Sequence, residues 1–88
     1  MVRLPLTAEQ IAAGKRLGEH LRRARGGRTL VDVAVHARIS PETLRKIEAG
    51  RLVTPGFPTV VAIARSLEIP LDELADICLG AETLGETG

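Results

Sequence analysis

The chain has 88 residues and a net charge of +1, with 44% hydrophobic and 26% charged residues, which is ordinary for one small soluble domain. No apolar run approaches the length of a membrane span and no signal peptide precedes the first helix, so we expect a cytoplasmic protein without a membrane partner. The single cysteine, Cys78, excludes an internal disulfide and is too few for a cysteine metal site.

Charge is divided unevenly along the chain. Residues 1–53 carry eleven Lys and Arg against five Asp and Glu, a net charge of +6, whereas residues 54–88 carry one against six, a net charge of −5. Surface charges of a small protein can scatter in this way by chance. A basic half of this kind is also the electrostatic pattern that attracts phosphate.

The first expected helix covers residues 8–25. Thr7 and Gln10 have the spacing of a capping box, in which each side chain accepts a hydrogen bond from the other's backbone. Gly14 and Gly18 within the helix, four residues apart, either let another helix approach closely or simply weaken the helix, by about 1 kcal/mol each relative to alanine.

Two short helices are expected next, at 30–37 and 41–49, joined by a turn at 38–39. Thr29 and Ser40 are of the residue types that cap helix N-termini. A tight turn between two capped short helices is typical of a helix-turn-helix unit.

The helix at 41–49 has one apolar face and one polar face. The polar face carries Glu42, Thr43, Arg45 and Lys46. Hydrogen-bonding side chains on a short capped helix are what reading base edges in the major groove requires, so we expect these four to contact bases. Glu42 fits a structural role equally well, because an acid in the first turn stabilises a helix.

Two further helices, 58–67 and 71–79, complete an all-α chain. Phe57, the only aromatic residue, is expected to fill the core. An apolar stripe on the last helix is made of Leu74, Ile77 and Cys78. This stripe either closes the core of one chain or forms the interface of a homodimer.

An ordered set of residues carries a family resemblance. Its members are Arg23, Gly27, Thr29, Ala34, Ile39, Ser40, Leu44, Ile47, Glu48 and Gly50, followed by the segment PGFPTVVAIARSLEIPLDEL. Over roughly residues 17–77 the chain resembles the Cro/Xre (lambda-repressor-like) DNA-binding family, which implies a compact five-helix domain. We place that domain at 7–79, between a flexible arm at 1–6 and a disordered tail at 80–88.

Phosphate contacts are expected from residues around the two short helices. The set comprises Arg28, Thr29, Arg38, Ser40, Arg51 and Thr54, of which the last is implied by the resemblance alone. The resemblance also implies a structural salt bridge between Arg23 and Glu48. Phosphate contacts position a protein on the duplex, and base contacts select the sequence.

The chain departs from the family pattern at three positions. Leu30 and Ala49 stand where the family usually has glutamine and asparagine, and Arg38 stands at a turn position often held by glycine. The first two changes remove polar contacts to the DNA backbone, so phosphate affinity depends on the arginines.

We therefore expect a sequence-specific regulator of transcription, a repressor that binds double-stranded DNA as a homodimer and lies at the nucleoid when bound. One alternative is the antitoxin of a toxin–antitoxin pair. Another is an adaptor of the transcription machinery that has lost specific DNA binding. No nucleophile–base pair, phosphate-binding loop or metal-ligand cluster is present in the sequence, so we expect no enzyme activity, cofactor or metal.

Overall fold

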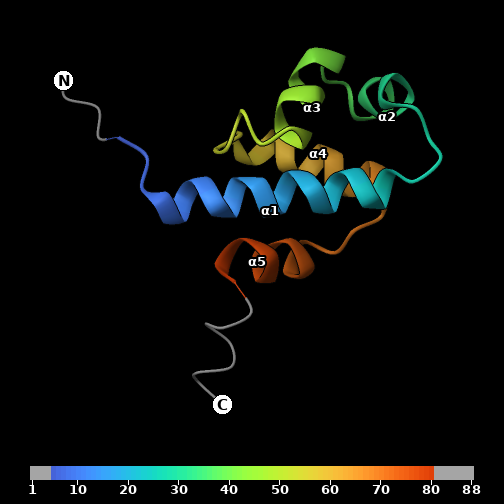
Figure 1. Ribbon diagram of the computed structural model, residues 1–88. Helices are drawn as coiled ribbons and strands as arrows, with labels where there is room; N and C mark the ends of the chain where they lie inside the picture. Colours follow the sequence, from blue (N-terminus) through green and yellow to red (C-terminus); the bar gives the residue numbers. More distant parts are fainter. Residues whose placement is uncertain (1–4, 81–88) are drawn as a thin grey trace.

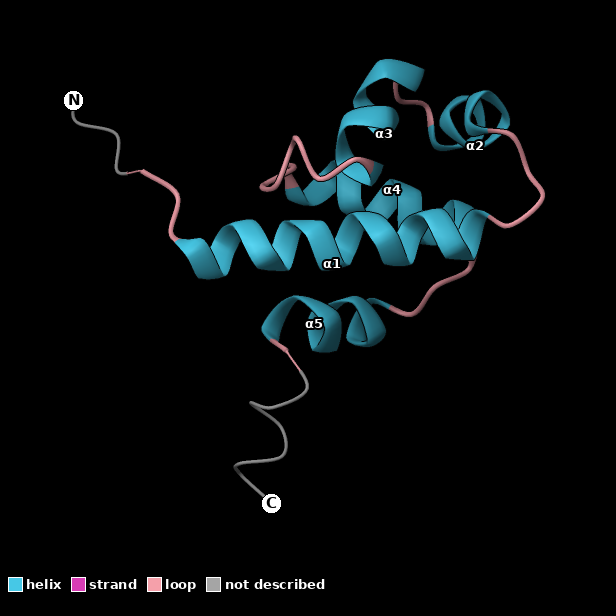
Figure 2. Cartoon of the chain, viewed as in Figure 1, coloured by secondary structure: helices cyan, strands magenta, loops and turns pink. Residues whose placement is uncertain are grey.

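The computed structural model describes residues 5–80, and every regular element in that range is an α-helix (Figure 1, Figure 2). The helices are α1 (Ala8–Arg25), α2 (Leu30–Ala37), α3 (Pro41–Glu48), α4 (Phe57–Leu67) and α5 (Leu71–Leu79). The five expected helices are confirmed, with α3 ending one residue earlier and α4 beginning one residue earlier than expected. Residues 1–4 of the expected arm and 81–88 of the expected tail lie outside the described residues.

Side-chain caps determine where α1 and α2 begin. Thr7 Oγ1 accepts from the Gln10 backbone N–H at 3.0 Å, and Gln10 Oε1 accepts from the Thr7 N–H at 2.8 Å. Thr29 Oγ1 accepts from the Asp32 N–H at 3.0 Å. Each capping side chain accepts a hydrogen bond from a backbone N–H that has no partner within the helix. Such a cap stabilises the helix by about 1 kcal/mol.

The long helix α1 lies between α5 on one side and α2, α3 and α4 on the other (Figure 1). All five helices contribute to one core, made of Leu17, Leu21, Val33, Ala34, Ala37, Leu44, Ile47, Ile63, Ala64, Leu67, Ile69 and Leu74. Burying one such leucine or isoleucine side chain contributes about 1.5–3 kcal/mol. The core therefore depends on small and aliphatic residues and on short distances between helices.

Gly18 allows α1 and α3 to pack closely. A methyl group added at Gly18 would overlap the carbonyl oxygen of Ile47 and lie 2.8 Å from that of Glu48. At Gly14 an added methyl group would overlap the side chain of Val53, in the loop after α3. The close approach of another helix is therefore confirmed at Gly18, whereas the close neighbour of Gly14 is a loop residue.

The last helix, α5, is fastened to α1 by polar contacts. Arg16 donates from Nε to the carbonyl oxygen of Ile77 at 2.9 Å and from Nη2 to that of Cys78 at 3.1 Å. His20 Nε2 lies 2.6 Å from Glu73 Oε2. These contacts hold α5 along α1 independently of apolar packing.

The apolar stripe of α5 is used mainly inside the chain. Leu74 is 3% exposed and belongs to the core, which agrees with the alternative that the stripe closes the core of one chain. Its position on the α5 face that meets α1 is the physical reason. Ile77 and Cys78 are half-buried.

The expectation that Phe57 fills the core is also wrong, because 70% of this residue is exposed. It is the first residue of α4, and side chains in a helix lean toward the N-terminus. At this position the ring therefore projects beyond the start of α4 instead of into the core.

We expect Gly18→Ala to lower the free energy of unfolding by about 1–3 kcal/mol, because the methyl group meets backbone atoms of α3 that cannot move aside easily. Urea unfolding followed by circular dichroism would measure this change. Gly27→Ala is the control, since a methyl group there meets nothing within 4 Å. Equal stability of the Gly18 variant and the native chain would contradict the close packing of α1 on α3.

Candidate nucleic-acid interface

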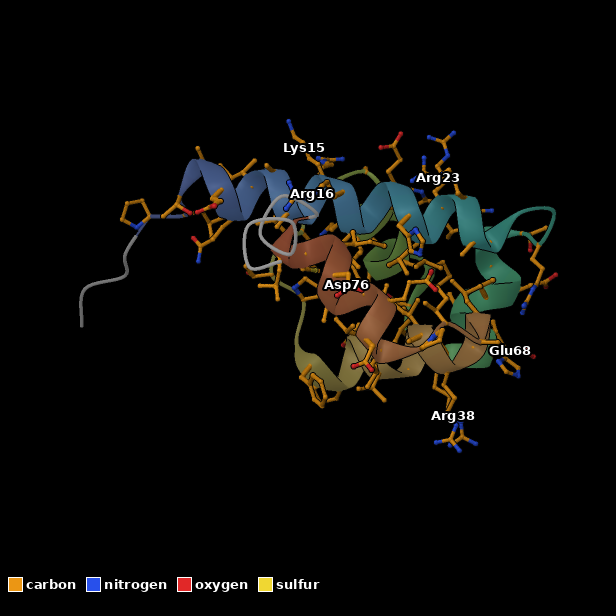
Figure 3. The ribbon with its side chains drawn as sticks, turned by 90° about the horizontal axis from the view of Figure 1, so that it is seen from below. Lys15, Arg16, Arg23, Arg38, Glu68 and Asp76 are labelled. Atoms are coloured by element: carbon orange, nitrogen blue, oxygen red, sulfur yellow. The ribbon has the colours of Figure 1, made fainter. Side chains whose placement is uncertain are left out.

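The turn between α2 and α3 depends on Arg38 in a left-handed conformation, with φ 61° and ψ 41°. The next N–H, that of Ile39, donates to the carbonyl oxygen of Ala34 at 3.0 Å. This ending closes α2 and redirects the chain into α3 within two residues. Arg38 is exposed, and its side chain extends away from the body of the protein (Figure 3).

Ser40 fixes the start of α3. Its Oγ accepts from the Thr43 backbone N–H at 3.0 Å and lies 2.8 Å from Thr43 Oγ1. Pro41 occupies the first turn, where its missing N–H costs no hydrogen bond. The side chain of Thr43 is half-buried and hydrogen-bonded to Ser40, whereas the other three residues expected to contact bases are exposed.

The exposed face of α3 carries Glu42, Arg45 and Lys46. Arg45 Nη1 lies 2.6 Å from Glu42 Oε1, and each of these two side chains is 59% exposed. Among the residues that the structure describes, Lys46 makes no ion pair. The face therefore offers one free cation and one arginine held by a neighbouring carboxylate.

The expected salt bridge of Glu48 is formed with a different arginine. Arg25 pairs with Glu48 through two hydrogen bonds of 2.8 and 2.9 Å, whereas Arg23 is exposed and points outward (Figure 3). The Arg23–Glu48 pairing is thus wrong, because Arg25 continues the helix face of Leu21, one turn further on. The spacing of residues along the sequence does not determine how α1 is rotated about its own axis, and this rotation decides which arginine faces Glu48.

The Arg25–Glu48 pair ties the end of α1 to the end of α3. The side chain of Glu48 is 7% exposed and that of Arg25 is 18% exposed. The hydrogen bonds that Arg25 donates to the Glu48 carboxylate raise the pKa of the Arg25 guanidinium, against the lowering effect of partial burial. A doubly hydrogen-bonded pair at this depth fixes the orientation of α3 on the scaffold.

Of the six residues expected to contact phosphate, four are exposed near the ends of α2 and α3, whereas Arg28 and Thr54 have other neighbours. Thr29 and Ser40 lie at the exposed N-termini of α2 and α3, and Arg38 and Arg51 are exposed. Arg28 differs, because it donates from Nη1 to the carbonyl oxygen of Ser66 at 3.2 Å. Thr54 is exposed in the loop after α3, where it borders an apolar groove instead of α3.

Arg22 lies beside α3, a placement that the sequence reasoning missed. It lines a hollow of about 190 Å³ together with Arg25, Arg45, Glu48 and Ala49. The sequence does indicate this placement of Arg22. Helical spacing of three and four residues puts it on the same face of α1 as Gly18 and Arg25. Arg22 extends the basic surface from α3 onto α1.

Two capped helices joined by a tight turn, with the second exposing a polar face, define a helix-turn-helix protein. The sequence profile of the helix-turn-helix domain matches residues 16–77, which is 62 of the 88 residues. The chain therefore belongs to this helix-turn-helix family, which is of the Cro/Xre type, and the resemblance seen in the sequence is confirmed. No curated protein matches the chain.

Two other kinds of site were sought in the described part of the chain. No helix between residues 5 and 80 is long and apolar enough to cross a membrane. The same residues contain no group of three or more His, Cys, Asp and Glu placed to hold a metal ion.

We expect Glu48→Gln to lower the free energy of unfolding by about 1.5–3 kcal/mol, because it leaves the partly buried guanidinium of Arg25 without its charged partner. The same unfolding measurement on Arg23→Gln provides the control, and there the change should stay within about 0.5 kcal/mol. The reverse ranking of these two variants would restore Arg23 as the partner of Glu48.

Proposed function

We propose that the protein is a sequence-specific regulator of transcription that binds double-stranded DNA with α3 in the major groove. It acts in the cytoplasm as a homodimer, and it represses a promoter by occupying it. The observation that carries this proposal is the exposed polar face of α3 on a helix fixed by Ser40, Gly18 and the Arg25–Glu48 pair. A base-reading helix gains specificity when its orientation does not change between free and bound protein.

The base contacts belong to four side chains of α3. Lys46 is free to donate to guanine O6 or N7. The Glu42–Arg45 pair is highly exposed, and such pairs contribute about 0–1 kcal/mol, so it opens readily when a base offers better partners. Arg45 then donates to guanine and Glu42 accepts from cytosine N4. Thr43 contributes its methyl group against a thymine methyl.

Phosphate binding rests on the exposed cations around α3. Arg38, Arg51 and Arg22 supply positive charge on separate elements, and the helix N-termini at Thr29 and Ser40 add backbone donors. This arrangement offsets the polar contacts that Leu30 and Ala49 lack. Arg28 and Thr54 contribute less, since one binds a backbone carbonyl and the other borders the groove.

The proposal is tested by binding of the purified chain to DNA upstream of its own gene and to random DNA, at low and physiological salt. A regulator retains its preference for one DNA as salt rises. Equal loss of both complexes would indicate phosphate attraction alone and would contradict the proposal.

For Lys46→Ala we expect a loss of discrimination between specific and random DNA of about 1–3 kcal/mol, because one base contact disappears. Arg45→Ala should act similarly. Arg65→Ala is the control, since this arginine is exposed on α4, outside the helix-turn-helix. Specific binding that survives both α3 variants would remove α3 as the reading helix.

Arg38→Gly should separate stability from binding. Because glycine adopts the left-handed conformation without steric strain, the substitution should raise the free energy of unfolding by up to about 1 kcal/mol. The loss of the cation should weaken binding to every DNA and reduce the salt dependence by about one ion. Glu68→Gly, at φ 59° after α4, is the matched control and should change stability alone. Unchanged salt dependence in the Arg38 variant would exclude its phosphate contact.

A second candidate is a protein-interaction module, either an antitoxin or an adaptor of the transcription machinery. It is favoured by Ala49 on the exposed surface and by an apolar groove beside α5. An adaptor would be indifferent to Arg45→Ala and Lys46→Ala.

A further inference from the structure

The hollow of about 190 Å³ between the C-terminal parts of α1 and α3 collects positive charge. It is lined by Arg22, Arg25, Arg45, Glu48 and Ala49 and is called the α1–α3 hollow below. Three guanidinium groups share this space with one carboxylate, so the lining carries a net charge of +2. Like charges in one hollow repel one another, and an anion between them removes the repulsion.

The one carboxylate of the lining balances only one of the three arginines. Both oxygens of Glu48 accept hydrogen bonds from Arg25, at 2.8 and 2.9 Å. Arg22 is exposed, and its side chain makes no ion pair or hydrogen bond with another residue between positions 5 and 80. The unbalanced charge of the α1–α3 hollow therefore belongs to Arg22 and Arg45.

Arg45 still has donors to offer. It contacts Glu42 through Nη1 alone, at 2.6 Å, and both side chains are 59% exposed. Within the described part of the chain, its Nε and Nη2 make no hydrogen bond. Exposed ion pairs of this kind are weak, so another anion can take the place of Glu42.

Ala49 keeps the α1–α3 hollow open. It stands where the family usually has asparagine, and it is an exposed residue of the lining. A methyl group takes up less space than an asparagine side chain and offers the arginines no hydrogen-bond acceptor. This departure from the family pattern thus leaves both room and unpaired positive charge for a ligand.

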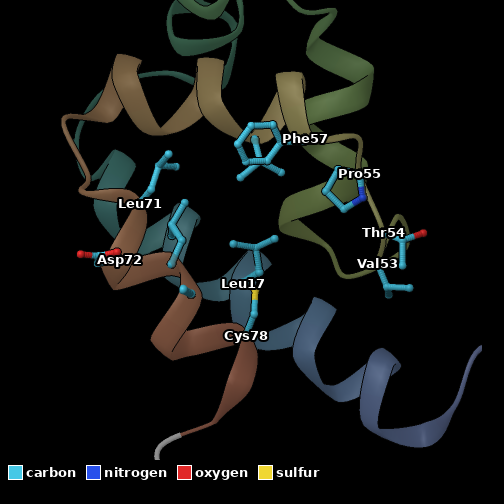
Figure 4. Close-up of a pocket in the computed structure, with 11 residues that line it drawn as sticks. Leu17, Val53, Thr54, Pro55, Phe57, Leu71, Asp72 and Cys78 are labelled. Atoms are coloured by element: carbon cyan, nitrogen blue, oxygen red, sulfur yellow. The ribbon is translucent and has the colours of Figure 1, made fainter.

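The larger groove beside α5 has a different chemistry (Figure 4). It has a volume of about 530 Å³, and most of its lining is apolar, with Leu17, Val60 and Leu74 among the residues. Asp72 is the only charged residue of that lining. An anion would meet a carboxylate and no cation there, so of these two sites only the α1–α3 hollow suits an anion.

We propose that the α1–α3 hollow binds the phosphate group of a small molecule between Arg22 and Arg45. A phosphate monoester carries a charge of about −1.5 to −2 at neutral pH, which matches the charge of the lining. Arginine binds phosphate through two parallel hydrogen bonds, and the oxygens of one phosphate accept from two guanidinium groups at once.

The bound small molecule lowers the affinity for DNA, a step that rests on the proposed function. Arg45 is one of the side chains proposed to contact bases, and Arg22 supplies charge for the DNA backbone. A guanidinium that holds a small molecule is withdrawn from guanine and from the backbone. A backbone phosphate of DNA is the second source of the same chemical group, and the experiment separates the two sources.

Isothermal titration calorimetry with inorganic phosphate, without DNA and at fixed pH and ionic strength, tests the site. The native chain should bind phosphate saturably. Arg22→Gln should raise the dissociation constant about tenfold or more, as loss of a charge-assisted hydrogen bond does. Arg23→Gln is the matched control, because it removes the same charge from a neighbouring side chain that points outward (Figure 3). Ala49→Leu should abolish binding without any change of charge, since leucine fills the hollow.

A second arm measures DNA binding while phosphate replaces chloride at constant ionic strength. The affinity of the native chain for DNA should fall severalfold, because phosphate occupies Arg22 and Arg45. The affinity of Arg22→Gln, compared with its own value in chloride, should stay constant.

Equal dissociation constants of phosphate for Arg22→Gln and the native chain would overturn the inference, as would equal weakening by Arg23→Gln. Absence of saturable phosphate binding, with DNA binding still weakened by Arg22→Gln, would assign the hollow to DNA and also overturn it. Phosphate that binds without lowering DNA affinity would overturn the competition. Because the calorimetry contains no DNA, its result is separate from a failure of DNA binding, which would overturn the proposed function instead.

Discussion

The contact of α3 with α1 is the constraint on which the rest of the structure depends. Gly18 removes the side chain that would separate the two helices, and the Arg25–Glu48 pair joins their C-terminal ends. With α3 fixed in position, Leu44 and Ile47 are both fully buried. The opposite face of the same helix is then presented to solvent in a defined orientation, which a reading helix requires.

Two surfaces of different chemistry follow from this arrangement. The surface around α3 combines Arg22, Arg38, Arg45 and Lys46 from three parts of the chain. The groove beside α5 is apolar and carries one carboxylate. The residues that line the groove include none of α3, and α1 lies between α3 and α5 (Figure 1).

The helices could be predicted from the sequence because their signals are local. Thr7, Thr29 and Ser40 cap the helices they precede, and periodicity gives the inward faces. The predictions that failed depend on how a helix is rotated about its axis and on how deeply a side chain is buried. A local sequence pattern determines neither. To predict that Arg25 and not Arg23 pairs with Glu48, one must know the rotation of α1 about its own axis. To predict that Phe57 is exposed, one must know where the core ends. For the residues expected to contact bases, helical spacing predicted the polar face of α3, and the Ser40–Thr43 and Glu42–Arg45 contacts are likewise local, since each joins residues three apart.

The proposed function requires that α3 selects a DNA sequence. The most direct measurement is selection from a random double-stranded DNA library by the native chain and by Lys46→Ala, followed by sequencing of the bound fraction. We expect the native chain to enrich a common half-site that contains guanine. We expect Lys46→Ala to lose its preference at one or two positions of that half-site. Enrichment of the same half-site by both proteins, or of none by the native chain, would contradict the proposed function.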